Sequence, residues 1–354
     1  IMVTAASHSL TFDFGATSSG SFTGNSNFSD YKLFNQDNLD ATASKLTAFA
    51  WIKNRDAGDS HVLADRVRGV GKVLHSDATA AETTEDNTVM RFLQRGVQVG
   101  SSVEVNTSGE SYVLWQWLLG DSATTGSTNT AGSVDTTVIA ADAGNFSIVK
   151  GTTGGSGATF GHGLGAAPDL IINKDLNNAS SNWLVYNSIS GATFYLALNL
   201  TNSIFGPGST VFGTEPDGDV FTLGSFFANV ECINYCFRSV PGICKVGSYE
   251  GNNDANGSYV HLGFKPAWVL TKTIDASGAF GILDNKRDPD NPVQQRLFAN
   301  DNADEDTDGE QMDFLSDGFK LRKTGGFNNN NQTYIYLAMA EIGGNGTLPP
   351  IYGR

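Results

Sequence analysis

The sequence predicts an all-β protein built from three tandem β-sandwich-like modules that are related by an internal repeat and contain little helix. Three apolar segments end in a lysine, and each is followed about sixty positions later by a second apolar segment, as expected when one structural unit recurs along a chain. The composition is rich in Gly, Ser, Thr, Asn and Asp and only 17% charged, which favours strands and turns over helices. The lysine segments are Ala48–Lys53, Asp169–Lys174 and Ala267–Lys272, and the second segments are Tyr112–Trp117, Cys232–Phe237 and Tyr334–Met339.

Positions between the two segments of each copy support the repeat. A glycine precedes the closing tyrosine at the same distance in the first and third copies, at Gly96 and Gly318. The second copy has no glycine there, and Pro216–Gly218 is expected to form its turn. Alignment on the lysines also pairs His61 with Trp183 and Phe280, and Asp65 with Asn187 and Asp284.

The repeat length predicts the domain boundaries, because a period of this size matches one small domain with its own core. We expect a first β-module with amino-terminal strands at 1–119, a second at 146–242 and a third with a short tail at 243–354. Residues 120–145 are rich in Gly, Ser and Thr, which is typical of a linker or a surface excursion. Half-buried strands are expected at Leu10–Phe14 and Tyr31–Phe34, and weak helical character is confined to Ser76–Asp86.

Charge and hydropathy exclude several classes of partner. The net charge of −15 disfavours nucleic acid, because phosphate binding requires a cationic surface. The apolar runs are of strand length, too short for a membrane helix, and Ile1–Thr4 does not begin a signal peptide. We therefore expect neither nucleic-acid binding nor membrane insertion.

The three cysteines do not form a disulfide framework. Cys232 and Cys236 are four apart on an expected strand, too far from each other to bond, whereas Cys244 could reach either across a turn. The favoured interpretation is three reduced thiols packed in a core.

The chain contains acidic residues that could serve a glycan depolymerase, an enzyme that requires two carboxylates in a cleft. The densest mixture of acid and base is Asp284, Arg287, Asp288 and Asp290, but Asp-Pro-Asp-Asn-Pro is typical of a rigid surface turn. His61 and His75 have no nucleophile motif near them, and no phosphate loop or zinc spacing is present. The sequence therefore predicts no catalytic, cofactor-binding or metal-binding residues.

The acidic run 301–310 is the one segment that resembles a cation site. Asp304, Asp306, Asp308 and Gly309 copy the first half of a calcium loop, but the position of the bidentate glutamate is Leu315. A weak Ca²⁺ site and a solvated acidic turn remain as alternatives, and no other cofactor is expected.

Two further features have a structural and a functional interpretation. The repeated lysines either extend to solvent from their strand ends, which is favoured, or pair with an acid at a contact between copies. The loops Asn328–Gln332 and Asn252–Gly257 are either plain turns or exposed amide surfaces suited to glycans.

Six segments stand in this order along the chain: Trp51–Arg55, Ser60–Leu74, His162–Ile172, Val246–Asn252, Gly263–Leu270 and Phe314–Leu321. This ordered set resembles a repeat domain of unassigned activity found in tail-fibre and other virion proteins of tailed, often marine, bacteriophages. The resemblance implies a non-enzymatic virion protein, a tail-fibre or adhesion component that contacts the host surface, with no catalytic residues to transfer. It implies partners among other virion proteins, a homo-oligomer such as a trimer, and a host surface glycan; the alternatives are a glycan-degrading tail protein and a capsid-surface decoration protein.

Overall fold

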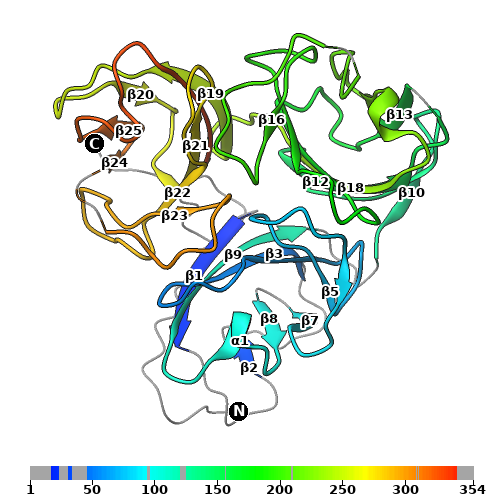
Figure 1. The fold of residues 1–354 in the computed structure, drawn as a ribbon, viewed down its shortest axis with the longest axis horizontal. Helices are drawn as coiled ribbons and strands as arrows, with labels where there is room; N and C mark the ends of the chain where they lie inside the picture. The colour runs from blue at the N-terminus through cyan, green and yellow to red at the C-terminus, as the bar shows by residue number, and fades with distance from the viewer. Residues whose placement is uncertain are drawn as a thin grey trace.

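The computed structural model contains three β-modules arranged around a common centre (Figure 1). Within the described residues nearly all regular structure is β-strand, with one short α-helix, α1 (Val103–Asn106), and one 3-10 helix, η2 (Ser225–Phe227). The expected all-β class is confirmed. The described residues are 17–23, 31–33, 46–93, 96–119, 125–155, 157–208, 210–307, 309 and 311–340.

The first module has a main antiparallel sheet in which the closing strand lies between the amino-terminal strand and the strand that ends in lysine. This sheet places Thr17–Thr23 of the amino-terminal segment against the closing strand. The order is β1 (Thr17–Thr23), β9 (Ser111–Leu119), β3 (Leu46–Asn54) and β4 (Val62–Asp65).

The main sheet of the second module has the same central order and is extended at one edge. The extension is a hairpin from the segment expected to be a linker or surface excursion: its Thr, Val and Ile residues pair with the next strand along the chain. Four consecutive β-branched residues at 136–139 carry that strand signal, which the surrounding Gly and Ser obscure. The order is β10 (Ser127–Asn129), β11 (Thr136–Ala140), β12 (Phe146–Thr152), β18 (Glu231–Phe237), β14 (Leu170–Asp175), β15 (Leu184–Asn187) and β16 (Leu196–Ala197).

The third module repeats this order. Its strands are β19 (Cys244–Glu250), β26 (Thr333–Ala340), β21 (Pro266–Thr273), β22 (Gly281–Asp284) and β23 (Leu297–Phe298).

A smaller sheet covers the outer face of each main sheet and completes a sandwich. In the first and third modules it has three strands, and Gly96 and Gly318 are the first residues of the middle strand. In the second module it has two strands, preceded by a turn in which the Asp217 carboxylate accepts the Val220 amide. These sheets are β2 (Tyr31–Leu33), β8 (Gly96–Val99) and β7 (Val89–Leu93); β20 (Tyr259–His261), β25 (Gly318–Leu321) and β24 (Met312–Leu315); β13 (Ala158–Gly161) and β17 (Val220–Leu223); a further pair is β5 (Lys72–Val73) and β6 (Thr83–Thr84).

The three lysines occupy the same register in their sheets. Each lies opposite the second residue of its closing segment: Lys53 opposite Val113, Lys174 opposite Ile233, and Lys272 opposite Ile335. The three sheets therefore share strand order and register; the internal repeat in the sequence stays a prediction.

The two central strands of each main sheet are buried on both faces. Phe49 and Trp51 of β3 point into a core shared by all three modules, whereas Ala50 and Ile52 point into a core private to the first module. The shared core contains aromatic contacts between modules, with ring centroids of Phe49 and Tyr235 4.3 Å apart and those of Trp117 and Trp268 5.9 Å apart. Burial of both faces explains why these strands read as continuous apolar runs although the sheets are antiparallel.

Other local expectations have mixed outcomes. Tyr31–Leu33 is a strand, whereas Leu10–Phe14 lies outside the described residues. The expectation of weak helix at Ser76–Asp86 is wrong: this segment is a loop that includes β6, and it is held by contacts to the second module. All three cysteines are buried free thiols, as the favoured interpretation expected.

Candidate functional site

The modules contact one another in a cyclic order, each through a loop that follows the strand paired with its lysine strand, namely β4, β15 or β22. The loop of the first module reaches the second, where the Lys174 Nζ donates to the Thr79 carbonyl at 3.2 Å. The loop of the second reaches the third, where the Lys272 Nζ lies 3.4 Å from the Thr201 carbonyl. The loop of the third returns to the first, where His61 Nε2 lies 3.2 Å from the Asp301 carbonyl. These contacts close a ring.

The repeated lysines lie inside this ring and not at the surface. Lys53, Lys174 and Lys272 are each 0% exposed, and each Nζ also donates to the carbonyl of the following residue at 2.6 to 2.8 Å. Burial lowers the pKa of each lysine to about 8. The favoured expectation of solvent-reaching lysines is therefore wrong, because loop carbonyls of a neighbouring module or of the same module cover the strand ends.

Two of the three interfaces also contain a buried ion pair, at the end of β4 in one and of β22 in the other. In the first module the Arg68 Nε donates to the Asp65 carboxylate at 2.5 Å, and Tyr235 of the second module donates to the same carboxylate at 2.8 Å. In the third module the Arg287 Nε donates to Asp284 at 2.6 Å, and the Trp115 indole of the first module donates to it at 3.0 Å. We call each arrangement a clasp: an acid, the arginine three residues later, and an aromatic donor from the next module.

The interface between the second and third modules has no such pair at the equivalent position. Asn187 stands where the other modules have aspartate, and its side-chain oxygen accepts only a local bond from the Ser190 amide at 2.9 Å among those observed. By the cyclic order its counterpart in the third module is Leu337, which shares the register of Trp115 and Tyr235 but has no donor.

The three candidate acids for glycan cleavage differ in burial and in their hydrogen bonds. Asp284 is 0% exposed, and the Arg287 guanidinium, with hydrogen bonds from that residue and from Trp115, outweighs burial and holds its pKa below the usual range. Asp288 accepts the backbone amide of Gln294 at 2.6 Å and so stabilises a turn, while Asp290 is exposed beside it. Asp284 and Asp288 are thus occupied by structural bonds.

The two amide-rich loops pack against each other. Asn328 is 1% exposed and donates to the Asn252 side chain at 3.0 Å and to the Asp254 carbonyl at 2.8 Å. The expectation that Asn328 offers an exposed amide is wrong, since its side chain joins the two loops; Asn330 and Asn331 are the exposed residues of this tip.

The acidic run 301–310 contributes to the ring as well. Glu305 forms ion pairs with Arg55 of the first module at 2.7 Å and with Arg287 at 2.8 Å, and Asp306 pairs with Arg296. Asp308 and Glu310 lie outside the described residues, so the Ca²⁺ expectation stays a prediction.

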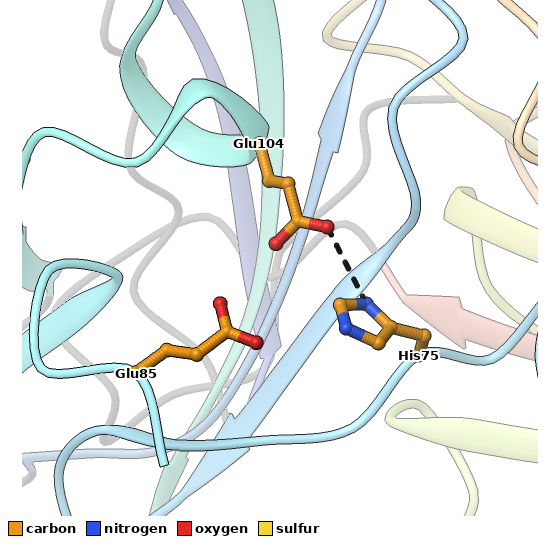
Figure 2. Close-up of side chains that lie close together, drawn as sticks. All are labelled: His75, Glu85 and Glu104. Carbon is orange, nitrogen blue, oxygen red and sulfur yellow. Dashed lines mark ion pairs between the residues drawn. The ribbon is translucent and has the colours of Figure 1, made fainter. Parts of the chain in front are cut away.

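A separate cluster of titratable side chains lies on the first module (Figure 2). His75 follows β5, Glu85 follows β6 and Glu104 belongs to α1, and one potential ligand atom from each lies within 4.8 Å of the others. In this view the two carboxylates and the imidazole face a common point, and His75 Nδ1 lies 3.9 Å from Glu104 Oε1.

The surroundings of this cluster disfavour the negative charge of Glu104. Burial raises the pKa of Glu104, and nearby Glu85, Asp59 and Asp77 raise it further, against the opposing effect of His75. One oxygen of Glu104 is shielded from solvent and has no hydrogen-bond partner.

Sequence reasoning considered His75 only as part of a nucleophile arrangement and missed both glutamates. Their separations along the chain match no metal-binding motif, and a four-residue helix has no periodicity to detect. The sequence alone does not predict that the three residues lie close together. The loop at 76–86, which contacts the second module, brings them near one another in the fold.

Among the described residues, no helix is long and apolar enough to cross a membrane. A family model described as a domain of unknown function, DUF7483, matches residues 21–342. No curated protein and no solved structure matches the chain.

Proposed function

The chain belongs to the DUF7483 family, whose function is unknown, and we propose that it is a non-enzymatic bacteriophage virion protein, a tail-fibre or adhesion component at the particle surface. The proposal rests on the resemblance of its ordered segments to tail-fibre repeat domains and on one structural observation. That observation is the use of the polar groups that recur among modules to bind one module to another.

The recurring lysines and clasps support a load-carrying role over a catalytic one. Each lysine is buried against carbonyl oxygens, and Asp65 and Asp284 are saturated by an arginine and an aromatic donor. A catalytic acid must exchange protons with substrate, which a carboxylate held in such a network cannot do without breaking it. Rigidity between modules is what a fibre or a decoration protein needs.

The shared core supports the same proposal. Two cavities within it have volumes of about 10 Å³ each, about the space of one water molecule, and apolar side chains dominate their lining. Such voids are packing defects between modules and too small for a sugar. In this proposal, binding of a host glycan or of other virion proteins uses the outer loops, including the exposed Asn330 and Asn331, and the particle carries the chain as an oligomer such as a trimer.

The position of the chain is tested on purified phage particles. We expect mass spectrometry to detect it in the particle and gold-labelled antibodies to mark the tail. Labelling of the capsid would favour the decoration protein instead, and absence from the particle would overturn the virion proposal.

The absence of activity is tested with the purified chain and host surface polysaccharide. We expect no release of reducing ends by the wild type. Asp288→Asn and Asp290→Asn are the informative variants, because Asp284→Asn also breaks a clasp. Reducing ends released by the wild type and abolished in these two folded variants would establish the glycan-degrading alternative.

A further inference from the structure

The cluster formed by His75, Glu85 and Glu104 has the composition of a metal centre. One ring nitrogen of His75 and one carboxylate oxygen of each glutamate already lie within 4.8 Å of one another. Ligand atoms that bind one zinc ion at about 2.0 to 2.2 Å lie roughly 3.0 to 3.5 Å apart. Side-chain rotations that move the three ligand atoms by about 1 to 2 Å would therefore complete a site. All three residues are only partly exposed, so the site is recessed yet reachable by an ion.

The histidine is held in the tautomer that metal binding requires. His75 Nδ1 lies 2.8 Å from the carbonyl oxygen of His61, so this nitrogen carries the proton and donates it. The lone pair is therefore on Nε2, the ring edge that faces the Glu85 carboxylate in Figure 2. A backbone carbonyl that orients the second ring nitrogen is the usual support of a histidine ligand.

Glu104 supplies an independent indication of a missing cation. Its Oε2 is inaccessible to water and has no hydrogen-bond partner, although a shielded carboxylate oxygen without a partner is energetically costly. Asp59 and Asp77 add negative charge nearby. A cation between Glu104 and Glu85 would give that oxygen a partner and offset the repulsion between the two carboxylates.

We propose that His75, Glu85 and Glu104 bind one divalent transition-metal ion of the zinc class and that the ion fastens the first module to the second. One imidazole with two carboxylates suits zinc better than Ca²⁺ or Mg²⁺, which prefer oxygen ligands alone. Solvent water fills the remaining coordination positions.

The fastening role follows from where the ligands lie. The His75 carbonyl accepts the indole N–H of Trp183 in the second module at 2.8 Å, and the Thr79 carbonyl, four residues on, accepts from Lys174. The Glu82 amide donates to the Leu176 carbonyl of the second module at 2.9 Å. An ion that ties His75 and Glu85 to α1 would restrain both ends of this inter-module loop.

The test uses the whole chain after removal of metal with a chelator. We expect calorimetric titration with ZnCl₂ to give one site per chain, Co²⁺ to give visible d–d bands at the same stoichiometry, and zinc at 100 times its Kd to raise the Tm by about 3 to 6 °C. Hydrogen exchange in residues 76–86 should slow when zinc is bound.

The matched variants are Glu85→Gln, which retains the length of the side chain, and His261→Gln, which alters an exposed histidine elsewhere. Glu85→Gln should weaken zinc binding at least tenfold with unchanged circular dichroism, and His261→Gln should not. Zinc binding that is absent, that is unaffected by Glu85→Gln, or that Ca²⁺ or Mg²⁺ equals in affinity would overturn the proposal. Binding without slower exchange at 76–86 would overturn the fastening role.

Discussion

The interface between the first and second modules contains a buried clasp, whereas the one between the second and third contains none. Asp65 and Arg68 meet the hydroxyl of Tyr235, but the position equivalent to Asp65 in the second module is Asn187 and its counterpart is Leu337. The acid, the arginine and the aromatic donor are present together in two places and replaced together in the third. A buried charge is tolerated only with its full set of partners, so the three positions change as a unit.

The largest effect is expected from removal of one member of a clasp. Asp65→Ala leaves the guanidinium of Arg68 buried without its nearest carboxylate and should lower the free energy of unfolding by about 3 to 5 kcal/mol. Asn187→Ala, at the interface without a clasp, should cost about 1 kcal/mol, because it removes one local hydrogen bond. Urea unfolding of both variants measures the difference, and equal costs would show that the clasp has no special role.

Replacement of the whole pair sharpens the same comparison. Asp65→Asn with Arg68→Ser copies the residues of the second module and leaves no unpaired charge, so it should cost less than Asp65→Ala alone. Urea unfolding again provides the measurement. A double variant as unstable as the sum of its single variants would contradict the view that these positions change as a unit.

The apolar interface depends on Leu337 instead of a clasp. Leu337 is buried in the shared core at the register of Trp115 and Tyr235, so Leu337→Ala should cost about 2 to 5 kcal/mol through lost burial and a new cavity. The midpoint of chemical unfolding measures this. A change within about 0.5 kcal/mol would mean that the site collapses without cost or that β26 is not central.

The buried lysines predict a moderate rise of stability with pH. Their folded pKa of about 8 lies below the unfolded value of 10.5, so between these values the unfolded chain binds more protons, and raising the pH stabilises the fold by up to about 1.4 kcal/mol per unit for each lysine. The window to measure is pH 8 to 9, because the raised pKa values of the cysteines and tyrosines oppose the effect at higher pH. Lys174→Met should show a smaller slope of unfolding free energy against pH; an unchanged slope would rule out its titration.

A dependence on acid, comparable to that of one lysine, is expected at the interface between the third and first modules. Burial lowers the pKa of His61 to about 4, and its Nδ1 accepts the Trp51 indole N–H at 2.8 Å. Since the unfolded value is 6.5, stability from this residue is lost as pH falls from 6.5 toward 4. His61→Phe, which copies Phe280 of the third module, should remove that part of the acid sensitivity. Identical acid titrations of the two proteins by circular dichroism would contradict this.

Much of the fold could be predicted from the sequence because local periodicity carries it. The alignment of Lys53 with Lys174 and Lys272 and of Asp65 with Asn187 and Asp284 corresponds to equivalent strand positions. The burial of the lysines could not be predicted, since the carbonyls that satisfy them come in two of the three modules from a distant loop.

The same limit applies to the sites. The sequence shows Asp284, Arg287 and Asp288 as a dense group of charges. Their partners Trp115 and Glu305 are remote in sequence, so the ion-pair network cannot be predicted from it. His75 was noticed without Glu85 and Glu104, because only the loop at 76–86 brings them near one another, and its Ala and Glu content favoured a helix instead.

The closed cyclic order of the modules has a consequence for how the molecule comes apart. In a linear array a terminal module separates when one interface fails, but here the release of any module requires two interfaces to fail together. Partial opening is therefore disfavoured even where one interface is weak, and the whole chain should unfold as one cooperative unit. Because the ring is a single polypeptide, a substitution alters one interface and not three, so the interface at Leu337 could become apolar while the other two kept their charges.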